Sequence, residues 1–533
     1  MTVIDGTQIG SESTPLSTGQ SGGAARDAAG GGGGAGDTTA RRAVSGAAWN
    51  VVGQVYQQVM RLVSNVLLAR FVTADVLGTM AVVTQLNQAL YMFSDVGIGT
   101  SIVNHKRGGD LTFLRTAWTV QIVRSFVITG LGMLLAYPFA MLFADSTHPV
   151  DMLFWVTLAT TGAMLVNGFQ SVAFFLGTRE LRVARVLFMD IVAQTVGTGV
   201  SILLAWQLHN VWALVIGNLL TTLLRTLLSY VMLQKLSLRP SWDPESRKEL
   251  LGFGKWILVS TVLTFFANSM DRFLLAKLLG LSVFGLYNTA LMFAMVPIEL
   301  MLRITVSVLV PVYSKKKNDQ NQLPAEVFDR VGFVMLLVSG CMIAGVAATA
   351  PGFIRAVYKP NFHDAALMVP WLAAAAWLRV LHNNAVAAML AMGRAKSSAL
   401  GNGLKLAGVL TFVPLGFYLL HVPDKVVPGV IGASIGLAAG EFLKYVAFTI
   451  DASKARLKPL RADLPGTIQF LLAMGIVLAG QWWLRRQGAK PTYEAIICGC
   501  AVIAVYLPAL YRGGRMVAPH MKLPGFVRRL LRV

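Results

Sequence analysis

Long apolar segments recur along almost the whole chain and limit what it can fold into. A run of roughly 20 to 25 residues is long enough to cross a bilayer whose hydrocarbon core is about 30 Å thick. Of the 533 residues, 55% are hydrophobic and only 13% are charged, whereas soluble proteins carry about 25% charged residues. We therefore predict an all-α polytopic membrane protein with about 14 transmembrane helices. Their expected ranges are 44–70, 75–103, 113–143, 152–177, 184–207, 211–235, 253–279, 282–312, 327–350, 365–391, 397–420, 428–450, 465–485 and 493–511.

Basic residues are concentrated in alternate loops between these segments. The loops after the even-numbered spans are all rich in Lys and Arg, whereas the odd-numbered loops 144–151 and 206–210 contain none. FIRAVYK (353–359) weakens this pattern and RRQGAK (485–490) breaks it. Because short basic loops stay in the cytoplasm, the pattern predicts that both termini are cytoplasmic. The net charge of +21 therefore reflects membrane topology, and we expect no nucleic-acid partner.

One sequence phrase occurs twice and indicates an internal repeat. LLARFVTADVLGTM (67–80) returns as LLAKLLGLSVFGLY (274–287), at the same place relative to the predicted spans, and FFLGTREL (174–181) resembles AAMLAMGRA (387–395). Internal repeats around a midplane site are typical of transporters. We predict two pseudo-symmetric six-helix lobes plus a C-terminal helix pair. The expected parts are a disordered cytoplasmic Gly-rich tail (1–42), an N-terminal lobe (43–236), a cytoplasmic linker (237–252), a C-terminal lobe (253–452), the extra helix pair (453–511) and a basic cytoplasmic tail (512–533).

Polar residues form a stripe along one face of the first predicted span. They follow one another at helical spacing and are Gln54, Gln58, Arg61 and Asn65. The seventh span has a polar face of its own that includes Asn268, with Asp271 and Arg272 at its outer end. Because polar side chains are costly in lipid, we expect both stripes to face protein or a water-filled cavity.

Three arginines within predicted spans have no partner on their own helix: Arg61, Arg225 and Arg379. A charged side chain at a helix centre costs roughly 2.5 to 3.5 kcal/mol on insertion scales, so exposure of them all to lipid is implausible. An excess of arginine in a cavity suits an anionic ligand, and the planar guanidinium fork suits pyrophosphate. These residues, with the polar stripes, are our candidates for substrate binding.

Other charged residues are spaced so that they can pair within one helix. Glu299 and Arg303 are four residues apart, and Glu441 and Lys444 are three apart. Each pair can be a structural contact or part of a functional site, and the sequence leaves both readings open. We keep Arg303 as a candidate for substrate binding, and Glu299 with Asp271 as candidates for coupling or gating.

The sequence contains no constellation typical of covalent catalysis. GNGLKLAG (401–408) lies in an apolar helix without a preceding strand, so close helix packing explains it better than nucleotide binding. There is no Walker A motif, and the three Cys and seven His residues lack the spacing of a metal site. We expect no catalytic residue, no metal, no cofactor and no enzymatic activity.

Several short motifs together resemble the Wzx-type polysaccharide flippases. They are GAAWN (46–50), LLAR…LG (67–78), SDVGIGTSIV (94–103), the REL…R run (179–185) and DRFLLAKLLG…FGLYNTA (271–290). These flippases belong to the polysaccharide-transporter branch of the multidrug/oligosaccharidyl-lipid/polysaccharide exporter superfamily, and the colanic-acid type is the most similar. The resemblance covers roughly residues 43–510.

This resemblance implies a two-lobed bundle with a central cationic cavity in the bacterial inner membrane. It implies that undecaprenyl-pyrophosphate-linked oligosaccharide repeat units, held among membrane lipids, are moved to the periplasmic leaflet by alternating access. The polymerase and chain-length regulator of the same pathway are further candidate partners. The family supplies no signature residue to carry over, so the candidate residues above rest on this sequence alone.

Three other functions remain as alternatives. A cation-coupled small-molecule exporter of the same fold would favour an acidic cavity, whereas the unpaired intramembrane charges here are mainly arginine. A membrane-embedded polysaccharide polymerase or ligase would need a long exterior loop, and none is expected. A scaffold without transport activity would gain nothing from the cost of intramembrane charges.

Overall fold

The computed structural model consists almost entirely of α-helices. The predicted tail 1–42 and most of the predicted tail 512–533 lie outside the described residues, which are 49, 52–53, 55–94, 97–105, 107–145, 148–179, 183–233, 239–320, 323–422 and 426–517. A first helix covers 55–68. It is followed by α2 (Ala74–Phe93), α3 (Ile98–Asn104), α4 (Leu111–Phe143), α5 (Val150–Gly168), α6 (Ala173–Arg179), α7 (Val183–Leu208), α8 (Trp212–Val231), α9 (Pro244–Ile304), α10 (Val310–Gln320), α11 (Ala325–Val357), α12 (His363–Leu381), α13 (Asn383–Ala391), α14 (Ala395–Leu420), α15 (Val426–Lys454), α16 (Pro459–Arg486) and α17 (Pro491–Val517).

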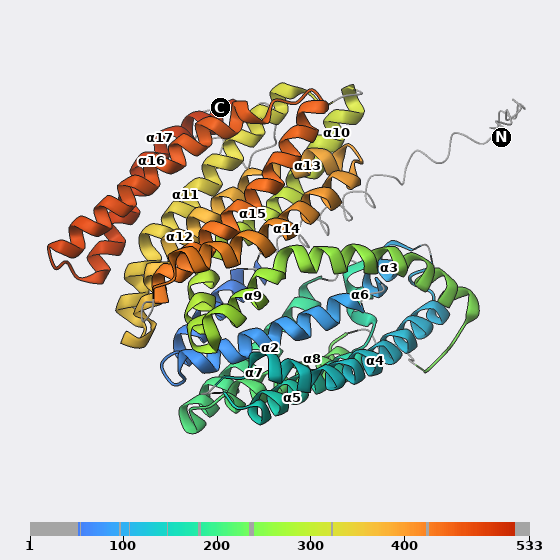
Figure 1. Cartoon of the computed structure of the whole chain (residues 1–533). Coiled ribbons are helices and arrows are strands. Elements are labelled where there is room, and N and C mark those ends of the chain that lie inside the picture. Colours follow the sequence, from blue (N-terminus) through green and yellow to red (C-terminus); the bar gives the residue numbers. More distant parts are fainter. Residues whose placement is uncertain are drawn as a thin grey trace, which may run out of the picture.

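Two groups of helices lie on either side of α2 and α9 (Figure 1). In one group α4 packs against α5, and α7 packs against α8. In the other group α14 packs against α15, and α16 and α17 pack against α11 at the outer edge. We call residues 55–233 the N-lobe and residues 244–517 the C-lobe. The predicted two-lobed, all-α membrane fold is confirmed, whereas the residue boundaries of its parts stay a prediction.

Eleven helical segments of the described chain are long and apolar enough to cross a membrane. One of them, Thr261–Ile304, is interrupted at Gly280, where φ is 73°, so it corresponds to two of the predicted spans. The 20-residue helix α2 is not among the eleven, because Gln85, Asn87 and Gln88 lower its hydropathy. The first helix is only partly described. The count of 14 spans therefore stays a prediction.

Three predicted spans are each two helices in the structure, and this corrects the sequence analysis. Span 75–103 breaks between α2 and α3, where Gly97 has a φ of 65° that other residues rarely adopt. Span 152–177 divides into α5 and α6, and span 365–391 divides into α12 and α13. A related irregularity is the π-helical turn Thr305–Leu309 between α9 and α10. The breaks coincide with short polar interruptions that include Ser94, Ser171 and His382, and the long apolar stretches on either side concealed them in the sequence.

The two copies of the repeated phrase contact each other across the lobes. Gly78 in α2 and Gly285 in α9 occupy equivalent places in the two phrases. A Cβ atom at Gly78 would lie 1.9 Å from the carbonyl oxygen of Leu281, and one at Gly285 would lie 1.8 Å from that of Ala74. Only glycine allows two helix backbones to approach so closely. The repeat thus marks a contact between the N-lobe and the C-lobe (Figure 1).

The second half of the predicted linker is helical and forms the start of α9. Asp243 caps this helix by accepting a hydrogen bond of 2.8 Å from the backbone N–H of Ser246. The hydrogen bonds from Ser246 hold the pKa of Asp243 below its ordinary value. Arg107, in the loop before α4, lies 3.0 Å from the carboxylate of Glu245. The start of α9 is thereby held against the N-lobe.

Candidate functional site

The polar stripe of the first helix faces residues of the C-lobe. Arg61 donates two hydrogen bonds of 3.0 Å each to the two carboxylate oxygens of Glu299 in α9. Asn65 accepts a hydrogen bond of 2.8 Å from the hydroxyl of Tyr358, which follows α11. Gln58 is half-buried, and Gln54 lies outside the described residues. Arg61 and Asn65 therefore lie where the two lobes meet.

Arg61 and Glu299 pair with each other from different helices, so residue spacing along one helix does not predict the pair. The two carboxylate oxygens and the guanidinium form a bidentate pair, which is the strongest geometry for such a contact. The side chains remain 47% and 36% exposed, so the pair contributes little to stability. Glu299, which is also spaced to pair with Arg303 four residues later, accepts both of these hydrogen bonds across the lobes. Arg303 itself is exposed.

A second polar cluster is buried inside the C-lobe, among α9, α12, α14 and α15. The ammonium group of Lys405 lies 2.6 Å from one carboxylate oxygen of Glu441, and it donates a hydrogen bond of 3.1 Å to Asn268. Asn268 in turn donates to the carbonyl of Thr264. Arg379 lies 3.9 Å from the same oxygen of Glu441. We call Arg379, Lys405, Glu441 and Lys444 the charge cluster.

The charge cluster has more positive than negative groups. Three cations share one carboxylate, because the charge of Lys444 also acts on Glu441. The side chains of Lys405 and Glu441 are only 6% and 8% exposed, whereas that of Arg379 is 21% exposed. Buried ions are costly unless they are compensated. The excess positive charge therefore suits an anion that approaches from the exposed side of Arg379.

The candidates Asp271 and Arg272 follow Asn268 closely in α9. Arg272 has a buried Nε atom without a hydrogen-bond partner among the described residues. Asp271 is half-buried beside it in the chain. Their roles in substrate binding and coupling stay predictions.

Arg225 has a structural partner within the N-lobe. Its Nε atom lies 2.9 Å from the carboxylate of Asp190 in α7, and its guanidinium lies 5.1 Å from the centre of the Phe174 ring. Spacing along the chain does not predict this pair, because Arg225 and Asp190 are on different helices. The contact ties α7 to α8, so it weakens the case for Arg225 as a substrate ligand.

Three residues of the charge cluster, Lys405, Glu441 and Lys444, are not among the site residues predicted from the sequence. Lys405 and Glu441 are ionisable residues inside apolar segments, and such residues in a membrane span indicate a functional site. The sequence spacing suggests Lys444 as a partner for Glu441, whereas the structure places Lys405 against Glu441 at 2.6 Å. Among the residues that the structure describes, no group of three His, Cys, Asp or Glu side chains could hold a metal ion.

Comparisons with known proteins agree with this architecture. A family model described as "Polysaccharide biosynthesis protein" matches residues 67–367. The chain is 24% identical to the lipopolysaccharide biosynthesis protein WzxC of Escherichia coli (strain K12), over 83% of this chain and 89% of that protein. These matches confirm the resemblance inferred from the short motifs.

Two solved structures share the fold. The lipid II flippase MurJ, in an inward closed conformation, aligns with a TM-score of 0.64 at 12% identity and covers 87% of this chain and 98% of its own. An inward-facing multidrug resistance MATE family transporter of the MOP superfamily aligns with a TM-score of 0.58 at 15% identity, over 75% of this chain and 95% of its own. At these identities the likeness concerns the fold alone.

Proposed function

Since this chain belongs to the polysaccharide biosynthesis protein family, we propose that it is a flippase for undecaprenyl-pyrophosphate-linked oligosaccharide repeat units. It moves them across the bacterial inner membrane by alternating access, for exopolysaccharide or O-antigen biosynthesis, and makes no covalent change. Both termini are then cytoplasmic, as the basic loops predict. The names of WzxC, a lipopolysaccharide biosynthesis protein, and MurJ, a lipid II flippase, support this class of substrate.

The observation that carries the proposal is the excess positive charge of the charge cluster. A pyrophosphate group is a compact anion that a guanidinium can bind through two parallel hydrogen bonds. Arg379 is well placed to do so, because its side chain is more exposed than that of Lys405, the other cation in contact with Glu441. Arg61 adds a second guanidinium at the contact between the lobes.

Alternating access requires two arrangements of the lobes around one site. The Arg61–Glu299 pair joins the first helix to α9, and the backbones of α2 and α9 meet at Gly78 and Gly285. These contacts are candidates for the ones that break and re-form when the lobes move. The polymerase and chain-length regulator of the pathway remain candidate partners.

Arg379→Ala is expected to reduce repeat-unit translocation by about a hundredfold, the effect of losing a charged hydrogen bond of roughly 3 kcal/mol. The Lys405–Glu441 contact does not depend on Arg379, so the variant should still insert and fold. The measurement is complementation of a deletion strain, with lipid-linked repeat units counted in each leaflet. Arg61→Ala is expected to act in the same direction.

Arg486→Ala is a matched control for this experiment. Arg486 is exposed and stacks on Trp482 at 4.0 Å, in the helix pair α16 and α17. Its loss should leave translocation unchanged. Normal translocation in both Arg61→Ala and Arg379→Ala would exclude the proposed anion site. Failure of the deletion strain to accumulate cytoplasmic-leaflet repeat units would exclude the flippase itself.

A small-molecule exporter is the second candidate, because the MATE family transporter shares the fold. A site for cationic substrates requires an excess of carboxylates. The charge cluster has the opposite balance, with three cations and one carboxylate. This observation favours the flippase.

A further inference from the structure

The N-lobe contains a cavity that none of the candidate residues lines. Its volume is about 470 Å³, and it lies between the end of α2, α3, α4, the end of α5 and α6. This volume is within the range of small-molecule sites, roughly 300 to 1,000 Å³. The cavity is therefore large enough for one or two sugar residues.

Backbone breaks create this cavity. Gly97 at positive φ turns the chain out of α2 and into α3. Gly99 leaves room for the ring of Phe175, since a Cβ atom there would lie 2.7 Å from a ring carbon. Gly168 ends α5 where its own Cβ would meet the hydroxyl of Ser125. The cavity thus lies at the breaks between α2 and α3 and between α5 and α6, where the predicted spans were continuous.

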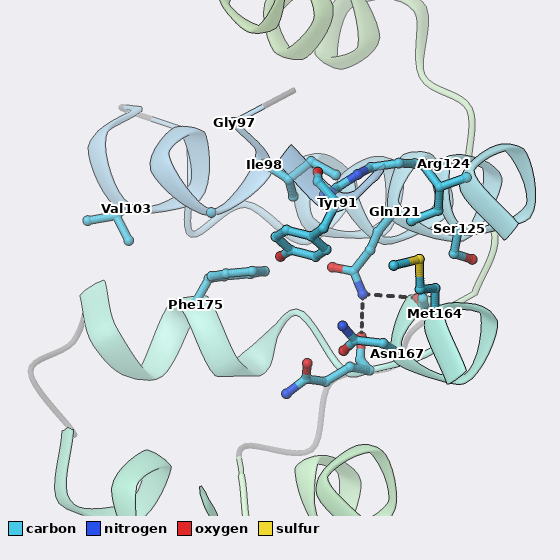
Figure 2. A pocket seen from close by; sticks show the side chains of 14 residues that line it. Tyr91, Gly97, Ile98, Val103, Gln121, Arg124, Ser125, Met164, Asn167 and Phe175 are labelled. Atoms are coloured by element: carbon cyan, nitrogen blue, oxygen red, sulfur yellow. Dashed lines mark hydrogen bonds between the residues drawn. The ribbon is translucent and has the colours of Figure 1, made fainter. Parts of the chain in front are cut away.

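Aromatic rings and amide groups both line the cavity (Figure 2). Tyr91 and Phe175 present their rings, and Gln121 and Asn167 present amides. Gln121 is held in place because its Nε2 atom donates to the carbonyls of Gly168 and Gln170, at 3.0 and 2.9 Å. Tyr91 is held by the guanidinium of Arg124, which lies 4.5 Å from the ring centre. The walls are pre-organised.

Two of the amides have hydrogen-bonding capacity to spare. The side chain of Asn167 has no hydrogen bond to any other residue that the structure describes, and the buried Nε2 atom of Gln170 has no partner there either. Arg124, by contrast, donates to the hydroxyl of Ser94 and to the carbonyl of Tyr91, at 3.0 and 2.9 Å. The cavity therefore offers free neutral donors and acceptors, while its guanidinium is already bound by protein.

The equivalent place in the C-lobe is closed. It lies between the end of α9, the π-helical turn Thr305–Leu309, α11, the end of α12 and α13, and its volume is only about 10 Å³. Asn384 fills it by accepting a hydrogen bond of 2.6 Å from Tyr313 and donating one to the carbonyl of Phe328. A Cβ atom at Gly332 would lie 2.2 Å from the Asn384 amide. The repeated architecture alone therefore does not produce the N-lobe cavity.

We propose that the N-lobe cavity is a saccharide subsite that binds one or two sugar residues of the oligosaccharide. The apolar face of a sugar ring packs on an aromatic ring, and its hydroxyls pair with amides that act as both donor and acceptor. Tyr91 and Phe175 supply the first contact, and the half-buried amide of Asn167 supplies the second. This inference rests on the proposed function for the identity of the sugar, and it separates sugar recognition from pyrophosphate binding at the charge cluster.

The test uses the full chain purified in lipid nanodiscs and two probes. One probe is the free repeat-unit oligosaccharide released by mild acid from the strain's own lipid-linked intermediates, and the other is inorganic pyrophosphate. Calorimetric titration is expected to show that Phe175→Leu and Asn167→Ala each weaken oligosaccharide binding about tenfold. Phe175→Tyr should retain binding, because it keeps the ring.

Phe188→Leu is the matched control, since Phe188 is an exposed aromatic residue of the same lobe that does not line the cavity. Asn167→Ala removes no side-chain hydrogen bond within the described part of the protein. Its effect on oligosaccharide binding therefore tests the cavity even if Phe175→Leu destabilises α6. Pyrophosphate binding should fall in Arg379→Gln and stay unchanged in both cavity variants.

The outcomes separate this subsite from the proposed function. Wild-type protein that fails to bind the oligosaccharide, or cavity variants that bind it normally, would overturn the subsite while translocation could still be intact. A fall in pyrophosphate affinity in Asn167→Ala would also overturn it, since the cavity would then be an anion site. Oligosaccharide binding that depends on Phe175, in a protein that translocates no lipid-linked unit, would uphold the subsite and overturn the flippase.

Discussion

Glu441→Leu is expected to destabilise the protein by about 3 to 5 kcal/mol, the cost of leaving a buried charge without its partner. Lys405 is 6% exposed and lies 2.6 Å from the carboxylate that would be lost. Asn268 would remain as a neutral acceptor at 3.1 Å, which cannot compensate the charge. Thermal unfolding of the purified protein in detergent should therefore show a clearly lower transition temperature.

The double variant Glu441→Leu/Lys405→Met distinguishes a lost charge pair from a lost packing contact. The double variant removes the buried Lys405–Glu441 pair as a whole, and such replacements are often neutral or stabilising. We expect the double variant to recover most of the lost stability. Glu326→Leu is the control, because Glu326 pairs with Arg330 at the surface and is 64% exposed. An equally stable Glu441→Leu variant would show that the carboxylate does not hold the charge cluster.

Gly78→Leu and Gly285→Leu are expected to reduce translocation about tenfold or more and to lower the unfolding temperature. Each new side chain would start less than 2 Å from a backbone carbonyl oxygen of the facing helix, and backbone cannot move aside as a flexible side chain can. Overpacking of this kind costs roughly 1 to 3 kcal/mol. Under alternating access, either leucine should favour the arrangement of the lobes in which α2 and α9 are apart at the Gly78–Gly285 contact.

Gly345→Leu provides the matched control for the glycine experiment. Gly345 lies within α11, and a Cβ atom there meets nothing within 4 Å. The same substitution should therefore preserve both translocation and the unfolding temperature, since leucine also favours the helix. Normal activity in Gly78→Leu and Gly285→Leu would show that the helices do not need to meet at these glycines.

Much of the fold could be predicted because its signals are local in the sequence. Apolar segments of membrane-spanning length predicted the helices, and the structure confirms an all-α, two-lobed bundle. The repeated phrase predicted a relationship between two distant segments, and its two glycines meet in the structure. The breaks in three of the spans were missed, because a short interruption, such as the one at Gly97 with its positive φ, leaves the mean hydropathy of a segment almost unchanged.

The candidate site was predicted only in part, since its partners come from distant helices. The stripe containing Arg61 and Asn65 was found from helical spacing, and the structure places it at the lobe contact. Glu299 is 238 residues from Arg61, and Asn268 is 137 residues from Lys405. Spacing along one helix cannot show which helix packs opposite it.

Three properties follow from the amino-acid sequence without the structure: the chain enters a membrane, it is helical, and it contains a repeat. These properties follow from hydropathy, periodicity and self-similarity, which are all read along the chain. The tertiary structure alone decided that Lys405 neutralises Glu441, that Arg225 is held by Asp190, and that one lobe is hollow where the other is filled. Helix packing brings these groups together, and the shape of a cavity depends on all of its walls at once.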